Sequence, residues 1–114
     1  MATRREYMNF IMDQLSGLED ITFRLMMGEY IIYLRGKIAA YVCDGKLYVK
    51  PVESAKALMP SAPYEPPYGG AKKMLLVEDV DNREFLMELF EAMYDELPEP
   101  KPKNKKRGTA SRSV

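Results

Sequence analysis

The chain has 114 residues, a length that suits one domain and is too short for two. Of these residues 46% are apolar and 30% charged, which is the balance of a globular protein. It contains no histidine and one cysteine, which excludes histidine-based catalysis, zinc sites built from histidine or several cysteines of one chain, and an internal disulfide. The formal net charge is zero, but residues 101–114 carry six cations and no acid, so an acidic body with 17 acids and 11 bases precedes a basic tail.

The sequence shows no sign of export or membrane insertion. The first ten residues lack the apolar stretch of a secretory signal, and no apolar run approaches the ~20 residues that cross a bilayer. A single cysteine is also typical of a reducing compartment. We therefore expect a soluble, cytoplasmic protein without membrane contacts.

An amphipathic helix is predicted over residues 4–15, because apolar residues recur there at the i, i+3, i+4, i+7 spacing of one helical face. These residues are Met8, Ile11, Met12 and Leu15. Gly17 follows the pattern, and glycine readily adopts the left-handed conformation that commonly ends a helix. The helix is therefore expected to stop there.

Four strands joined by tight turns are predicted next, from alternating apolar residues and from β-branched and aromatic content. They are expected at residues 21–25, 30–34, 37–43 and 46–50. Asp44-Gly45 is the clearest turn, because a two-residue type I′ hairpin needs positive φ at both positions. The first turn is predicted at Gly28-Glu29. The strands carry four tyrosines, Tyr30, Tyr33, Tyr41 and Tyr48.

The second half of the chain predicts a short helix, a proline-rich connection, a strand and a long helix. They are expected at residues 52–59, 60–70, 73–77 and 82–97. We interpret the connection as a packed connector, with a partner-docking loop as the alternative. Asp81 or Asn82 is the candidate cap of the long helix.

This order of elements predicts an α+β fold: an antiparallel sheet of about five strands, with the N-terminal and C-terminal helices packed on one face. Residues 1–97 form the domain, and residues 98–114 form a disordered basic tail. One face of the sheet, with some of its tyrosines, is left uncovered. Such a face suggests a homodimer.

No residue pattern indicates catalysis, a metal or a cofactor. Both phosphate-binding glycine motifs are missing, and Cys43 is interpreted as a small buried side chain instead of a reactive thiol. The long helix has an acidic side formed by Glu84, Glu88, Glu91, Asp95 and Glu96. We interpret this side as solvated; an enzyme would have to use Glu84 and Glu88.

The basic tail has the charge of a phosphate-binding segment. Its cations are Lys101, Lys103, Lys105, Lys106, Arg107 and Arg112. We consider two roles for these cations: contact with the phosphates of nucleic acid, or a solubilising role alone. The sequence favours neither role over the other.

The stretch from Arg24 to Lys50 resembles the N-terminal domain of the TfoX/Sxy competence regulators, whose pattern reads approximately R-x-M-F-G-G-Y-x-x-Y, a glycine turn, then D-G-x-L-Y-x-K. The matching residues are Arg24, Met26, Gly28, Tyr30, Tyr33, Gly36, Asp44, Gly45, Leu47, Tyr48 and Lys50. The similarity covers about residues 4–97. Met27 and Glu29 depart from it, since the family favours phenylalanine and glycine there.

The resemblance implies a fold like the small secretion-chaperone-type dimers and lends no catalytic residue. Full-length members act in natural transformation as co-activators with a cAMP-receptor-type activator, and here the basic tail stands in place of their helical C-terminal domain. We therefore expect a non-enzymatic regulatory protein that binds a protein of the transcription machinery through its sheet face or acidic helix. The alternative is a nucleic-acid-binding protein that uses its tail.

Overall fold

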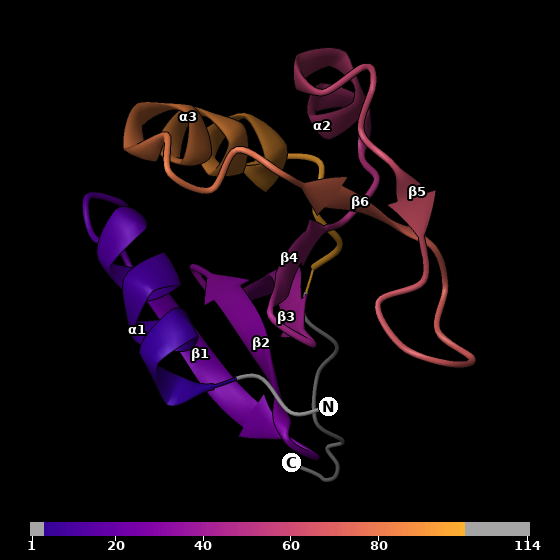
Figure 1. The fold of residues 1–114 in the computed structure, drawn as a ribbon. Coiled ribbons are helices and arrows are strands. Elements are labelled where there is room, and N and C mark those ends of the chain that lie inside the picture. Colours follow the sequence, from indigo (N-terminus) through magenta and orange to yellow (C-terminus); the bar gives the residue numbers. More distant parts are fainter. Residues whose placement is uncertain (1–3, 100–114) are drawn as a thin grey trace, which may run out of the picture.

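The computed structural model describes residues 4–99, which form one antiparallel sheet covered by helices (Figure 1). The helices are α1 (Arg5–Gln14), α2 (Glu53–Leu58) and α3 (Arg83–Tyr94). The strands are β1 (Ile21–Met26), β2 (Glu29–Leu34), β3 (Lys37–Cys43), β4 (Lys46–Val49), β5 (Tyr64–Glu65) and β6 (Met74–Val77). Their order in the sheet is β1-β2-β3-β4-β6-β5. None of the helices in residues 4–99 is long and apolar enough to cross a membrane.

Three two-residue hairpins build the first four strands. Their central pairs are Met27-Gly28, Arg35-Gly36 and Asp44-Gly45, and all six residues have φ between 49° and 85°. Positive φ at both positions matches the right-handed twist of the flanking strands, and glycine adopts it without a steric penalty.

The first turn lies one residue earlier than the sequence predicts. Glu29 is the first residue of β2 and pairs with Met26, so it is not part of the turn. Gly28 takes the second turn position, as Gly36 and Gly45 do in the other two hairpins. The unfavourable conformation therefore falls on Met27, whose φ is 54°, and glutamate at position 29 carries no backbone penalty.

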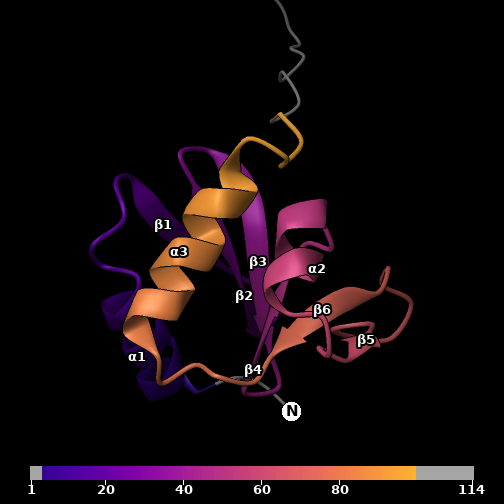
Figure 2. The same ribbon diagram turned by 90° about the horizontal axis from the view of Figure 1, so that it is seen from above.

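The core lies between the sheet and its three helices, all of which pack on one face (Figure 2). Figure 2 shows α3 running across the strands between α1 and α2. The helices contribute Met8, Ile11 and Leu15 from α1, Ala55 from α2, and Leu86, Leu89, Phe90 and Met93 from α3. Both long helices thus bury the apolar stripe that their spacing predicts. Tyr30 also points into this core, where its ring packs edge-on against Phe23 at 5.6 Å.

The proline-rich connection contains a sixth strand that the sequence does not predict. Residues 64 and 65 form β5 at the edge of the sheet, where Tyr64 pairs with Leu75. Prolines at 63 and 66 flank this strand. Proline has no backbone N–H to donate, and an edge strand tolerates this because it has a neighbour on one side only. The following residues turn back over the sheet, so that the face expected to be uncovered is partly covered by Pro67 and Tyr68.

Polar contacts fix α3 at both ends. At its start, the Asn82 side-chain oxygen accepts a hydrogen bond of 3.1 Å from the backbone N–H of Phe85, which makes Asn82 the cap. Near its end, Lys37 is 6% exposed and donates to the backbone carbonyl of Tyr94 at 3.2 Å. A cation at the last turn also complements the helix dipole.

Replacing the cap is expected to destabilise the protein. Asn82→Ala should lower the free energy of unfolding by about 1 kcal/mol, because the first-turn N–H of Phe85 loses its partner. Asp81→Ala is the matched control and should change it by less than about 0.5 kcal/mol. Urea unfolding followed by circular dichroism measures both, and equal losses in the two variants would contradict the assignment of the cap.

Candidate binding face of the sheet

The face of the sheet away from the helices, here called the outer face, carries a second and smaller apolar cluster. Cys43, Tyr48 and Met74 are buried there, with Tyr41 and Leu76 packed against them. Tyr41 lies opposite Tyr48 on the neighbouring strand, and directly opposed residues share a face. The Tyr48 hydroxyl donates to Glu65 at 3.0 Å, and burial together with this bond raises the pKa of Tyr48 to about 12.

Cys43 is a packing residue of this cluster. Its side chain is 1% exposed, and burial, with smaller contributions from the charges of Glu29 and Asp44, raises the pKa of its thiol to about 11. A thiol with this pKa stays protonated near neutral pH, and only the thiolate is a good nucleophile. The interpretation of Cys43 as a buried small side chain is confirmed. No group of three or more acidic or cysteine side chains able to hold a metal occurs within residues 4–99.

Two hollows lie side by side on the outer face, and Tyr41 and Tyr68 line both. The rings of these two tyrosines lie 6.2 Å apart between their centroids. The first, here called the apolar hollow, has a volume of about 430 Å³. Its lining is mostly apolar and comprises Met26, Met27, Tyr30, Ile31, Cys43, Gly69 and the two tyrosines, together with the carboxylate residue Glu29. The second, here called the lysine pocket, has a volume of about 290 Å³. Its lining includes Lys50, Lys72, Lys73, Tyr64 and the same two tyrosines.

The apolar hollow is bordered by unusually exposed apolar side chains. Met26 and Met27 line it and are 44% and 96% exposed. Leu25, at the same tip of the β1–β2 hairpin, is 64% exposed but lies opposite Tyr30 and therefore on the other face of the sheet. β1 is also an edge strand of the sheet, since it pairs only with β2. Contiguous exposed apolar side chains beside a sheet edge are typical of a surface that meets another molecule.

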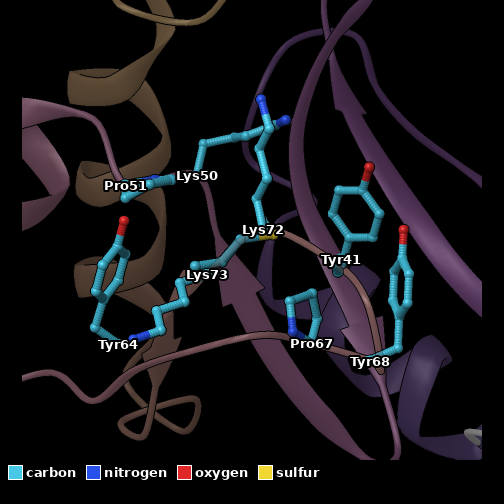
Figure 3. A pocket seen from close by; sticks show the side chains of 10 residues that line it. Tyr41, Lys50, Pro51, Tyr64, Pro67, Tyr68, Lys72 and Lys73 are labelled. Carbon is cyan, nitrogen blue, oxygen red and sulfur yellow. The ribbon is translucent and has the colours of Figure 1, made fainter.

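The lysine pocket combines residues from three parts of the chain (Figure 3). Lys50 follows β4, and its backbone N–H donates at 3.1 Å to the carbonyl of Ala39, the residue left unpaired by a bulge between β2 and β3. Lys72 and Lys73 precede β6, and Tyr64 belongs to β5. Figure 3 shows the Lys50 and Lys72 side chains converging, whereas Lys73 runs towards Tyr64.

The residues of the family motif divide between framework and outer face. Gly28, Gly36, Asp44 and Gly45 form the turns, and Tyr30 and Leu47 belong to the main core. Arg24, Met26, Tyr33, Tyr48 and Lys50 lie on or beside the outer face. Of these, Met26 lines the apolar hollow and Lys50 the lysine pocket. The six tail cations named as possible nucleic-acid contacts lie outside the described residues.

The acidic side of α3 is exposed, but part of it holds the fold together. Glu91 accepts two hydrogen bonds from Arg35, at 3.2 and 2.8 Å. Glu96, just beyond α3, accepts hydrogen bonds from the Ser54 hydroxyl at 2.5 Å and from the Ser54 backbone N–H at 2.8 Å, and these bonds lower the pKa of Glu96. These two carboxylates therefore have intramolecular partners.

The sequence does not reveal the lysine pocket. Lys50 is 22 residues away from Lys72, and only the pairing of β4 with β6 and of β6 with β5 brings these segments together. The available signal was the Lys72-Lys73 pair after a tyrosine-rich and proline-rich segment, since interleaved basic and aromatic residues are common in binding sites for polyanions.

The fold and its outer face define a small α+β domain that buries one side of an antiparallel sheet under helices and presents hollows on the other. The chain belongs to the TfoX N-terminal domain family, which matches residues 13–94. It is also similar to a Spirochaeta aurantia protein described as an uncharacterized 12.7 kDa protein in the trpE 5' region. The two are 29% identical over 110 residues, which cover 96% of each chain. No solved structure matches the chain.

Proposed function

We propose that this protein is a non-enzymatic regulatory protein that binds a component of the transcription machinery through its apolar hollow. Membership of the TfoX N-terminal domain family fits a regulatory role. The observation that carries the proposal is the pair of exposed apolar side chains, Met26 and Met27, that line that hollow. A transcription activator of the cAMP-receptor type is the proposed partner, because the full-length regulators that the motif resembles work with one.

Met27 supports a binding role for this hairpin. Its left-handed conformation costs an L-residue with a long side chain roughly 1–2 kcal/mol, whereas asparagine or glycine would relieve that penalty. Burial of its side chain does not offset the penalty, because the Met27 side chain is 96% exposed. An exposed and flexible methionine adapts well to a partner surface, and strain of this kind is often retained at functional positions.

The outer face is a better candidate than the acidic helix. Part of the acidic side of α3 already has intramolecular partners, such as Glu91 with Arg35, which leaves fewer carboxylates for another molecule. Exposed ion pairs also contribute little free energy, usually below about 1 kcal/mol. Burial of apolar surface provides roughly 25 cal/mol per Å², so the hairpin tip offers a larger gain on association.

The proposal predicts that one charge at the hairpin tip weakens partner binding. Met27→Glu should raise the dissociation constant for a purified cAMP-receptor-type activator by about tenfold or more, because the complex would have to desolvate a carboxylate. Glu84→Lys on the acidic helix is the control and should change it less than about twofold. Isothermal titration calorimetry measures both, and thermal melts verify that both variants fold.

The opposite pattern, with Glu84→Lys disruptive and Met27→Glu neutral, would move the partner site to the helix. No association of the wild-type protein with the activator at about 100 μM would overturn the proposed partner. The oligomeric state of the same samples, measured by sedimentation, tests whether the hollow instead binds a second copy of the chain. A wild-type dimer that Met27→Glu dissociates would assign the face to a second copy.

The second candidate function is nucleic-acid binding by the tail, favoured by six cations without an acid in residues 101–114. We expect duplex DNA binding by the full chain to weaken with salt, with a log–log slope of at most about −5, because each phosphate contact releases counterions. A chain ending at Pro100 should then fail to bind. Fluorescence anisotropy across a salt series measures this, and equal binding by both chains would exclude the tail.

A further inference from the structure

We propose that the lysine pocket is a nucleotide-binding site, in which Lys50 and Lys72 hold the phosphate, Lys73 adds positive charge beside Tyr64, and the tyrosine rings contact the base. This inference does not depend on the proposed function of the apolar hollow. It rests on the charge, the aromatic walls and the size of the pocket.

The pocket concentrates positive charge in an acidic body. Four of the eight other cations in residues 4–99 have a carboxylate partner: Arg35 pairs with Glu91, Lys37 with Glu99, Lys56 with Glu53 and Arg83 with Asp13. Within residues 4–99, no such pair involves Lys50, Lys72 or Lys73. Burial and the nearby Lys72 both lower the pKa of Lys50, so the ammonium groups of these two lysines repel each other. An anion between them would relieve this repulsion.

Phosphate is a suitable anion for this arrangement. Lysine binds phosphate as a point charge on a flexible stem, and several lysines can meet different oxygens of one group. Glu65, a carboxylate in the proline-rich connection between α2 and β6, accepts a hydrogen bond of 3.0 Å from the Tyr48 hydroxyl. It therefore has a partner other than the lysines.

The walls of the pocket offer aromatic surface to a base. Tyr64 and Tyr68 are 54% and 49% exposed, although tyrosine rings are usually more buried in a domain of this kind. The Lys50 ammonium lies 5.8 Å from the centroid of the Tyr41 ring, and the Lys73 ammonium lies 5.8 Å from that of Tyr64. Figure 3 shows Tyr41 and Tyr68 on one side of the lysines and Tyr64 on the other. Base-on-tyrosine stacking contributes ~1–3 kcal/mol per base.

The volume limits the ligand to one nucleotide unit. About 290 Å³ lies just below the range for small-molecule pockets, ~300–1,000 Å³. An acidic peptide would satisfy the cations but would leave the exposed rings without a flat partner. A nucleotide supplies both the charge and the flat group, either as a free molecule or as one unit of a single strand.

Calorimetry with the full-length chain tests the site with three probes: AMP, adenosine and inorganic phosphate. AMP should bind at least about tenfold more tightly than either fragment, because only AMP uses both the lysines and the rings. The double variant Lys72→Gln, Lys73→Gln should weaken AMP binding by about tenfold or more. The matched control, Lys46→Gln with Lys56→Gln, removes the same charge elsewhere and should change it less than about twofold.

A ten-residue oligothymidylate distinguishes the two sources of the nucleotide. If the pocket variant weakens its binding about tenfold, the occupant is one unit of a single strand. If only AMP binding falls, the occupant is a free nucleotide and any oligonucleotide binding belongs to another surface. The proposal is overturned if AMP does not bind at about 1 mM and oligothymidylate binding is the same in the pocket variant. It is also overturned if the control variant weakens binding as much, since binding would then follow net charge alone.

Discussion

The register of the β1–β4 meander is the constraint on which the rest of the structure depends. Successive side chains in a strand point to opposite faces, so a shift of one residue would exchange core and surface. Three hairpins with positive φ at both turn positions fix that register. As a result, Tyr30, Ile32 and Leu34 of β2 face the helices, while Ile31 between them faces the other way and lines the apolar hollow.

The bulge between β2 and β3 adds a local correction to this regular pattern. Ile32 pairs with Ala40 and Tyr33 with Ile38, so Ala39 has no partner of its own in the pairing. On its other side, towards β4, its carbonyl accepts the backbone N–H of Lys50, which continues the β3–β4 pairing by one residue. Bulges often occur near functional sites, and this one lies opposite the hydrogen bond that holds the backbone of Lys50, a lining residue of the lysine pocket. The framework and the outer face are therefore built by the same backbone contacts.

The sequence predicts much of this fold because its signals are local. The helical spacing of Met8, Ile11 and Leu15 and the Asp44-Gly45 turn each identify an element without knowledge of distant residues. The antiparallel α+β fold with terminal helices on one face is confirmed. The family motif also falls largely on turns and core positions, which explains why it indicates the fold more clearly than the activity.

The parts that the sequence does not predict depend on contacts between distant segments. β5 is only two residues long and lies among prolines, so its composition indicates a loop until β6 pairs with it. The same pairing brings Tyr68 over Tyr41 and separates the two hollows. Tyr30 cannot be told from the other strand tyrosines by residue type, and only the strand register places its side chain in the main core.

The central claim is that one sheet buries its inner face and presents apolar side chains on the hairpin at its edge. The solvent exposure of the methionine methyl groups tests it directly, measured by NMR with a soluble paramagnetic probe. Among the methionines of residues 4–99, the Met27 and Met26 signals should broaden most, and those of Met8 and Met93 should be protected. A Met27 methyl that is protected at every protein concentration, or an accessible Met8 methyl, would contradict this account of the two faces.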